Sequence, residues 1–165
     1  MKHYHHLVNQ VEEITVVIKQ YVLDRFEREY NLLIELPGVS AIIACVILSE
    51  IGPNVEAFQS QGNLASWAGV CPGSYESAGI KKSSHTTQGN KYLKSSLFQA
   101  GGTAGRSKDE AFHSLYTRIS SRSSKMKAII AYAHKMIRII YKILSTGEHY
   151  DTKKALGLRQ QARAI

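Results

Sequence analysis

The chain has 165 residues and a mass of 18.4 kDa, the size of one domain or of one domain with an extension, which excludes a large multidomain enzyme. Apolar residues make up 44% of the sequence and prolines number only 3, so the chain can bury a core and lacks the composition of a disordered segment. Charge is divided unevenly, because residues 1–78 carry 4 basic and 9 acidic side chains whereas residues 79–165 carry 17 basic and 4 acidic ones. The second half is therefore expected to bind a polyanion, with nucleic acid as the leading partner; a solvated basic face without a ligand is the alternative.

Neither membrane insertion nor a disulfide framework is expected. No apolar run approaches the ~18–20 residues of a membrane span, and the start of the chain lacks the apolar core of a signal peptide. Cys45 and Cys71 are too few for a disulfide scaffold and form no Cys-x-x-Cys pair, so both are interpreted as packing residues. These features predict a cytoplasmic protein.

One long helix is predicted over residues 7–34, because apolar residues recur there at steps of three or four and no proline or glycine interrupts them. Such a helix packs on its own domain or pairs with a second copy, and its length favours pairing. The chain is therefore expected to form a homodimer. The apolar stripe consists of Val11, Ile14, Ile18, Val22, Phe26, Tyr30 and Leu33.

A tight turn, Leu36-Pro37-Gly38-Val39-Ser40, leads into an apolar helix that starts at Ala41. The order apolar, Pro-Gly, apolar before a small-residue helix is typical of a helix-hairpin-helix unit, which grips the nucleic-acid backbone without reading bases. Gly38, Val39 and Ser40 are expected to hold one phosphate at the positive end of the helix. An ordinary buried helical hairpin is the alternative, since no Lys or Arg occurs between residues 29 and 80.

A short helix is expected within residues 56–72, with Trp67 in the core. Residues 73–90 are predicted to form a long polar loop that contains hydroxyls, glycines and the adjacent Lys81 and Lys82. Long loops inside compact domains are usually functional, and this mixture of side chains suits phosphate, although a flexible linker has a similar composition.

Three more helices are predicted, from Gly89 to about residue 105, over about Glu110–Arg122 and over Lys125–Leu144. The first carries Lys91 and Lys94 in its opening turns, where cations oppose the helix dipole unless an anion is bound.

The last of these helices carries a basic stripe, and the stripe is expected to contact the polyanion. The tail after Gly147 is expected to be frayed. The stripe consists of Lys135, Arg138 and Lys142.

The polar loop contains the best candidate nucleophile, Ser77, because the small residues Ala78 and Gly79 leave room beside it for a phosphodiester. Lys81 and Lys82 are suited to stabilise developing charge on a phosphate. No general base can be named from the spacing of residues. No metal-binding cluster is evident, so no cofactor is expected in this chain.

The run from Leu33 to about Ser145 resembles the C-terminal domain of the DEDD-type insertion-sequence transposases, the bridge-RNA-guided recombinases of the IS-one-ten type. The resemblance covers about two thirds of the chain, and the order and spacing of its motifs are more specific than any one of them. The matching residues are Leu36-Pro37-Gly38-Val39, Glu50-Ile51-Gly52, Leu64-Ala65-Ser66-Trp67-Ala68-Gly69-Val70-Cys71-Pro72, Glu76-Ser77-Ala78-Gly79 and Gly89-Asn90-Lys91-Tyr92-Leu93-Lys94.

The resemblance implies that Ser77 is the nucleophile for DNA strand exchange, through a covalent phosphoserine. It also implies DNA and a guide RNA as partners, and a bacterial, nucleoid-associated location. The family has a second, RNase-H-like domain whose acids hold Mg²⁺, joined through a coiled coil. That domain is absent from this sequence, so the chain is expected to be a truncated form that starts inside the coiled coil, and Mg²⁺ is expected in the absent domain.

The expected fold class is all-α, with a long coiled-coil-like helix over residues 1–34, a helix-hairpin-helix-containing transposase domain over 35–147 and a basic tail over 148–165. The expected function is DNA binding and strand transfer in a transposase, dependent on a metal-holding partner domain. Two alternatives remain open: a non-enzymatic nucleic-acid-binding regulator that pairs with full-length transposase, and a protein adaptor. The expected nucleic-acid-binding residues are Gly38, Val39, Ser40, Lys81, Lys82, Lys91, Lys94, Lys135, Arg138 and Lys142.

Overall fold

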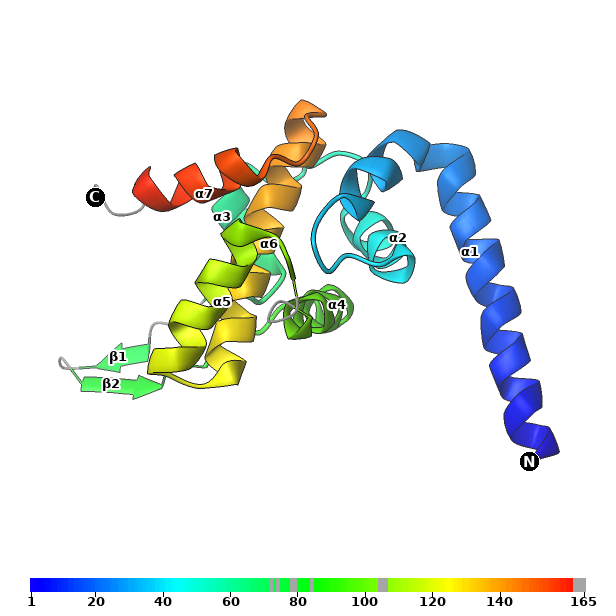
Figure 1. Cartoon of the computed structure of the whole chain (residues 1–165), viewed down its shortest axis with the longest axis horizontal. Helices are drawn as coiled ribbons and strands as arrows, with labels where there is room; N and C mark the ends of the chain where they lie inside the picture. Colours follow the sequence, from blue (N-terminus) through cyan, green and yellow to red (C-terminus); the bar gives the residue numbers. More distant parts are fainter. Residues whose placement is uncertain (72, 74, 78–79, 84, 104–106, 162–165) are drawn as a thin grey trace.

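The computed structural model describes residues 1–165 except 72, 74, 78–79, 84, 104–106 and 162–165. Helices dominate it, and the all-α fold class is confirmed; one short antiparallel hairpin interrupts the helices (Figure 1). The elements in order are α1 Lys2–Ile34, α2 Ala41–Ile51, α3 Gln61–Trp67, β1 Tyr75–Ser77, β2 Ile80–Ser83, α4 Lys91–Gly102, α5 Glu110–Arg122, α6 Lys125–Thr146 and α7 Thr152–Gln161.

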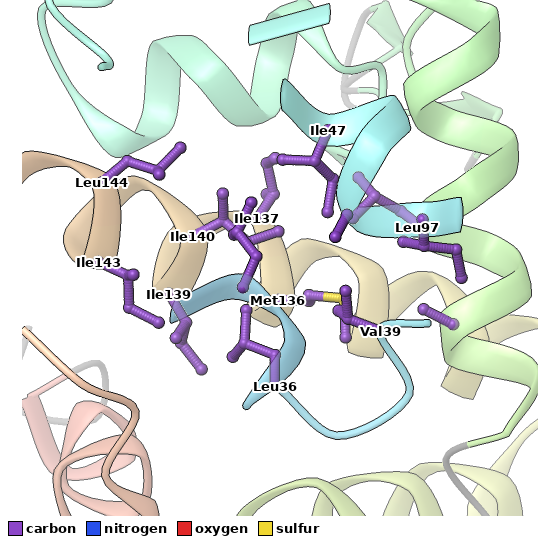
Figure 2. Packing of buried hydrophobic residues seen from close by; sticks show 14 of the residues in the cluster. Leu36, Val39, Ile47, Leu97, Met136, Ile137, Ile139, Ile140, Ile143 and Leu144 are labelled. Carbon is purple, nitrogen blue, oxygen red and sulfur yellow. The ribbon is translucent and has the colours of Figure 1, made fainter. Parts of the chain in front are cut away.

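Helix α6 is the centre of the core, and α3, α4 and α5 pack around it. Its inward side chains meet the α1–α2 turn, α2 and α4, as Figure 2 shows for Met136, Ile137 and Ile140 against Leu36 and Leu97. All five of these side chains are almost fully buried. Burial of each contributes about 1.5–3 kcal/mol relative to exposure, so this contact holds both halves of the chain together.

Side-chain caps explain why most helices begin where they do. In each case a serine, asparagine or aspartate oxygen accepts a hydrogen bond from an amide in the first turn, which satisfies a donor that has no partner within the helix. The capping residues are Ser40 for α2, Ser60 for α3, Asn90 for α4, Asp109 for α5 and Ser124 for α6.

Helix α1 forms over nearly all of the expected residues 1–34, and a bend divides its apolar stripe into two parts. Phe26 has non-helical backbone torsions (φ −137°, ψ 35°), so the helix bends there. After the bend, Tyr30 and Leu33 are buried in the core, whereas Val11 and Ile14 before it are 64% and 60% exposed. The first part of α1 therefore extends away from the body of the molecule (Figure 1).

The segment between α3 and α4 begins and ends close together, where the backbones of Gly69 and Gly89 are in contact. Gly69 has a φ of +71°, and a Cβ on it would lie 2.9 Å from the amide nitrogen of Gly89. The next residue, Asn90, donates its backbone N–H to the carbonyl of Trp67 (3.0 Å) and its side-chain amide to Glu50. Both glycines are thus required by close backbone packing.

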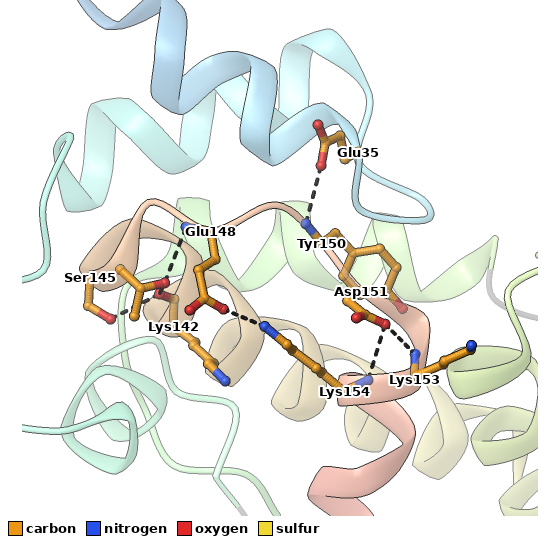
Figure 3. Close-up of polar contacts among 9 residues, drawn as sticks. Glu35, Lys142, Ser145, Glu148, Tyr150, Asp151, Lys153 and Lys154 are labelled. Atoms are coloured by element: carbon orange, nitrogen blue, oxygen red, sulfur yellow. Dashed lines mark hydrogen bonds and ion pairs between the residues drawn. The ribbon is translucent and has the colours of Figure 1, made fainter.

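The tail does not fray after Gly147, as expected from sequence, but forms α7 over Thr152–Gln161, so that expectation was wrong. The Asp151 carboxylate accepts the amides of Lys153 (2.7 Å) and Lys154 (3.3 Å) and so caps the helix (Figure 3). Glu35 accepts the Tyr150 amide at 3.2 Å, which ties the tail to the end of α1.

Two aromatic residues lie partly outside the core, and for Trp67 this corrects the expectation. Trp67 is 39% exposed, with its ring 5.3 Å from that of Phe58, and Tyr92 is 59% exposed. Both lie on faces that the core does not cover.

The cysteines are packing residues as expected: both are free, Cys45 is buried and Cys71 is partly buried against the core. Among the described residues, no helix is long and apolar enough to cross a membrane.

Candidate functional site

The polar segment that was expected to be a loop forms an antiparallel ribbon. Pairing begins at its base, where the Thr87 amide donates to the carbonyl of Cys71 (3.2 Å) and the Gly73 amide donates to that of His85 (2.8 Å). It continues through β1 and β2, in which Ser77 pairs with Ile80. The ribbon projects from the helical body (Figure 1).

Ser77 is the last paired residue before the turn of this ribbon. At about 3.3 Å per residue, six residues from Cys71 place its backbone roughly 20 Å from the base. The opposite strand carries Lys81 in register with Glu76, and a β-bulge leaves Lys82 as the extra residue. The side chains of residues 75–77 and 80–83, and all of Ala78 and Gly79, lie outside the described part of the chain.

Lys94 holds the base of the ribbon. Its ammonium donates to the Thr86 hydroxyl at 2.8 Å and to the Thr87 carbonyl at 3.0 Å. It also lies 5.8 Å from the centre of the Phe98 ring. Lys94 therefore connects α4 to the ribbon, an internal role beside the phosphate contact expected of it.

Lys91 is exposed at the start of α4. Its ammonium lies 4.8 Å from the centre of the exposed Tyr92 ring, so a cation and an aromatic face stand together at the surface. Cations combined with aromatic rings suit the phosphates and bases of a nucleic acid.

The predicted basic stripe on α6 is divided between internal and external roles. Lys135 donates to the carbonyl of Ala111 on α5 at 2.8 Å, and Arg138 donates to the Gln61 side chain on α3 at 3.2 Å. Lys142 is exposed. Lys135 and Arg138 therefore help to join three helices, which the sequence pattern did not indicate.

Beside these two residues lies a cavity of about 230 Å³ between α5 and α6, lined also by Ser114 and His134. The pKa of His134 is lowered, first by burial and second by the positive charge of Arg138. His134 is therefore kept neutral at neutral pH, and its surroundings are cationic.

The turn at Gly38 packs against protein. Gly38 has a φ of +84°, and a Cβ there would lie 2.8 Å from the carbonyl of Ala100 and 2.9 Å from the hydroxyl of Tyr132. Val39 is buried, and its amide donates to the carbonyl of Leu36 at 3.0 Å. Ser40 is exposed but uses its hydroxyl to cap α2. The close backbone approach at Gly38 therefore serves packing, as in an ordinary helical hairpin, and the phosphate contact expected at Gly38, Val39 and Ser40 stays a prediction.

Sequence reasoning missed the turn between α5 and α6. Residues 121–127 are all exposed and include Arg122, Lys125 and Lys127. A signal was present, because no Asp or Glu occurs between Glu110 and Glu148. The described residues contain no group of three or more His, Cys, Asp and Glu that could hold a metal ion, so no step is assigned to Mg²⁺ in this chain.

The segment that forms the Gly38 turn and the projecting ribbon with Ser77 also matches a known protein family. Residues 30–117 match the family model described as the Transposase IS116/IS110/IS902 family. The chain belongs to this family. The matched segment contains the Gly38 turn, the whole ribbon and α4.

Three curated relatives extend the comparison. The pilin gene-inverting protein of Moraxella bovis is 31% identical over 127 residues, which cover 74% of this chain and 39% of that protein. The putative transposase y4pF/y4sB of Sinorhizobium fredii is 29% identical over 154 residues, which cover 89% of this chain and 38% of that protein. An IS110 insertion-element protein of Streptomyces coelicolor is 27% identical, over 79% and 32% respectively. The chain therefore spans about two fifths or less of the length of these relatives.

Proposed function

We propose that this chain is the DNA-binding and strand-transfer part of an insertion-sequence transposase, with Ser77 as the nucleophile. The observation that carries the proposal is the family match over residues 30–117, because that segment includes the ribbon and places Ser77 next to its turn. Relatives named as a transposase and as a pilin gene-inverting protein support rearrangement of DNA as the reaction.

The proposed step is an exchange of one phosphate ester for another. The Ser77 hydroxyl oxygen attacks the phosphorus, its proton passes to a base, the bond from phosphorus to a deoxyribose oxygen breaks, and that oxygen takes up a proton. The phosphoserine conserves the ester, so a second deoxyribose hydroxyl can reverse the step and join new strands. Lys81 and Lys82, which follow the turn on β2, are the proposed stabilisers of the negative charge on the phosphate.

The other cations of the proposed interface hold backbone phosphates or guide RNA. Lys91 and Lys142 are exposed, Lys94 and Arg138 retain N–H donors beyond their internal bonds, and Lys135 is proposed together with Arg138 as part of the α6 stripe. By the family resemblance, Mg²⁺ belongs to an RNase-H-like domain of the DEDD type outside this sequence, and strand exchange depends on that domain.

The exposed part of α1 is proposed to pair with a second copy of the chain. Leu7, Val11, Ile14, Ile18 and Tyr21 follow one another at steps of four and three, the 3.5-residue repeat of a coiled coil, and all are exposed. Beside them, an apolar groove of about 540 Å³ opens between α1 and α2.

Such a pair would bring these five side chains into one apolar seam between the two helices. A two-fold pair of this kind uses the same surface on both copies.

The test is strand exchange on labelled duplex DNA that carries the sequences flanking this gene. The chain is mixed with a full-length relative whose matching serine is alanine, so Ser77 is the nucleophile under test. Ser77→Ala should abolish exchanged products and leave DNA binding intact, whereas Ser95→Ala, on the exposed side of α4, should leave both unchanged. Exchange that survives Ser77→Ala would refute the proposal.

A non-enzymatic regulator is the second candidate. It is favoured by the exposed apolar face of α1, which offers a surface for pairing with full-length transposase. In that case the mixed sample shows no exchange, binding remains salt-sensitive, and the chain inhibits a fully active relative. Binding that is insensitive to salt would instead indicate a protein adaptor.

A further inference from the structure

The exposed turn between α5 and α6 is a second basic surface, distinct from the ribbon and from the start of α4. It consists of Ser121, Arg122, Ser123, Ser124, Lys125, Met126 and Lys127, and every one of these residues is exposed. We call it the α5–α6 turn surface. It combines three cations with three hydroxyls, and it lies at the same end of the molecule as the ribbon in Figure 1.

Within the part of the chain that the structure describes, no acidic side chain neutralises the cations of this surface. Arg122 donates to the backbone carbonyl of Arg118 (3.3 Å), and neither Lys125 nor Lys127 has a side-chain hydrogen bond or ring contact within the described part of the chain. None of the three is in an ion pair there. The nearest acids in sequence are Glu110 and Glu148.

Folding gives no reason for lysines at these positions. Lys125 and Lys127 occupy the first turn of α6, where the positive end of the helix dipole makes a cation unfavourable. Both could be uncharged without loss of any internal contact. An external anion is the partner that makes their charge useful.

We propose that the α5–α6 turn surface binds the phosphate backbone of a nucleic acid, as a contact additional to those of the ribbon and α4. This rests on the proposed function. Cations and serine hydroxyls are the groups that contact phosphate oxygens without reading bases. A lipid surface fits less well, because Met126 is the only large apolar residue among the seven.

The test compares the full chain with Lys125→Gln/Lys127→Gln and with a control of equal charge change, Lys2→Gln/Lys153→Gln, at two exposed lysines outside this surface. Affinity for a duplex DNA and for a single-stranded RNA of equal length is measured across a range of salt. On duplex DNA the test variant should lower the slope of log affinity against log salt by about 1.8, since each neutralised phosphate contributes about 0.9. The control should leave the slope unchanged.

Thermal unfolding separates this role from a structural one, because removing two cations from the first turn of α6 should not lower Tm. If the slope of the test variant falls only for the DNA or only for the RNA, that nucleic acid is the one that this surface contacts. Wild-type binding with an unchanged slope in the test variant would overturn the inference and leave the proposed function standing. If the wild type binds neither nucleic acid, the proposed function fails first. Binding only to phosphatidylserine vesicles would overturn the inference as well.

Discussion

Gly38 lies where neighbouring segments approach too closely for any side chain. The sequence around it, Leu36-Pro37-Gly38-Val39, predicted a phosphate-gripping turn. In the structure its missing side chain makes room for the end of α4 and for Tyr132, whose hydroxyl donates to the carbonyl of Pro37. The sequence motif indicates that a glycine is needed at this position. The structure shows which atoms approach it, namely those of α4 and Tyr132.

Gly38→Ala should lower the free energy of unfolding by about 2–4 kcal/mol, from the left-handed backbone and from overpacking. Gly102→Ala is the matched control, because a Cβ there meets nothing within 4 Å, and it should be neutral or stabilise by up to about 1 kcal/mol. Urea unfolding measures both. Equal stability of the two variants would contradict the packing described at the turn.

His134 predicts a pH dependence of stability. Its pKa is lowered from 6.5 by burial and by Arg138, so the unfolded chain binds more protons than the folded one as pH falls through about 6.5. Stability should therefore decrease with falling pH in that window and level off below the lowered folded pKa.

The measurement is Tm at about pH 7.5 and at about pH 5.5 for the wild type and for His134→Gln, which is neutral throughout. The wild type should lose more stability than the variant. The same pH dependence in both proteins would show that His134 is not the group responsible.

At the scale of elements, helices were more predictable than the ribbon. The helix predicted over about Glu110–Arg122 forms with these bounds, because its apolar period and its capping residue Asp109 are local properties. The ribbon was missed because residues 73–90 lack alternation of apolar and polar residues. Its base depends on Gly69 and Gly89 crossing and on Lys94 reaching back to Thr86, which are contacts between distant residues.

Helix α1 carries the prediction on assembly. Ile14→Glu/Ile18→Glu places charge in the proposed seam and should convert a dimer to a monomer, as measured by sedimentation equilibrium. Val16→Glu is the control: Val16 is equally exposed and lies on the opposite face of the helix, so its substitution should leave the dimer intact. A monomeric wild type, or dissociation by Val16→Glu, would contradict pairing through this seam.

At the scale of the whole molecule, three basic surfaces are proposed to bind one nucleic acid. The uneven charge of the sequence anticipated a basic second half, and the structure distributes it over the ribbon, the start of α4 and the α5–α6 turn surface. The first half supplies the turn that packs under α6 and the exposed helix proposed for pairing. The acid-free stretch between Glu110 and Glu148 was visible in the sequence, but its exposure at a helical turn was not.

The most direct test of the central claim, that Ser77 forms an ester with DNA phosphate, is a search for a covalent adduct. The chain is incubated with labelled flanking DNA and Mg²⁺, with and without a full-length relative lacking its own nucleophile, and separated on a denaturing gel. If Ser77 is the nucleophile, the mixed sample gives a labelled protein band that disappears with Ser77→Ala and persists with Ser95→Ala. A band that survives Ser77→Ala, or no band in a mixed sample that carries out strand exchange, would contradict it.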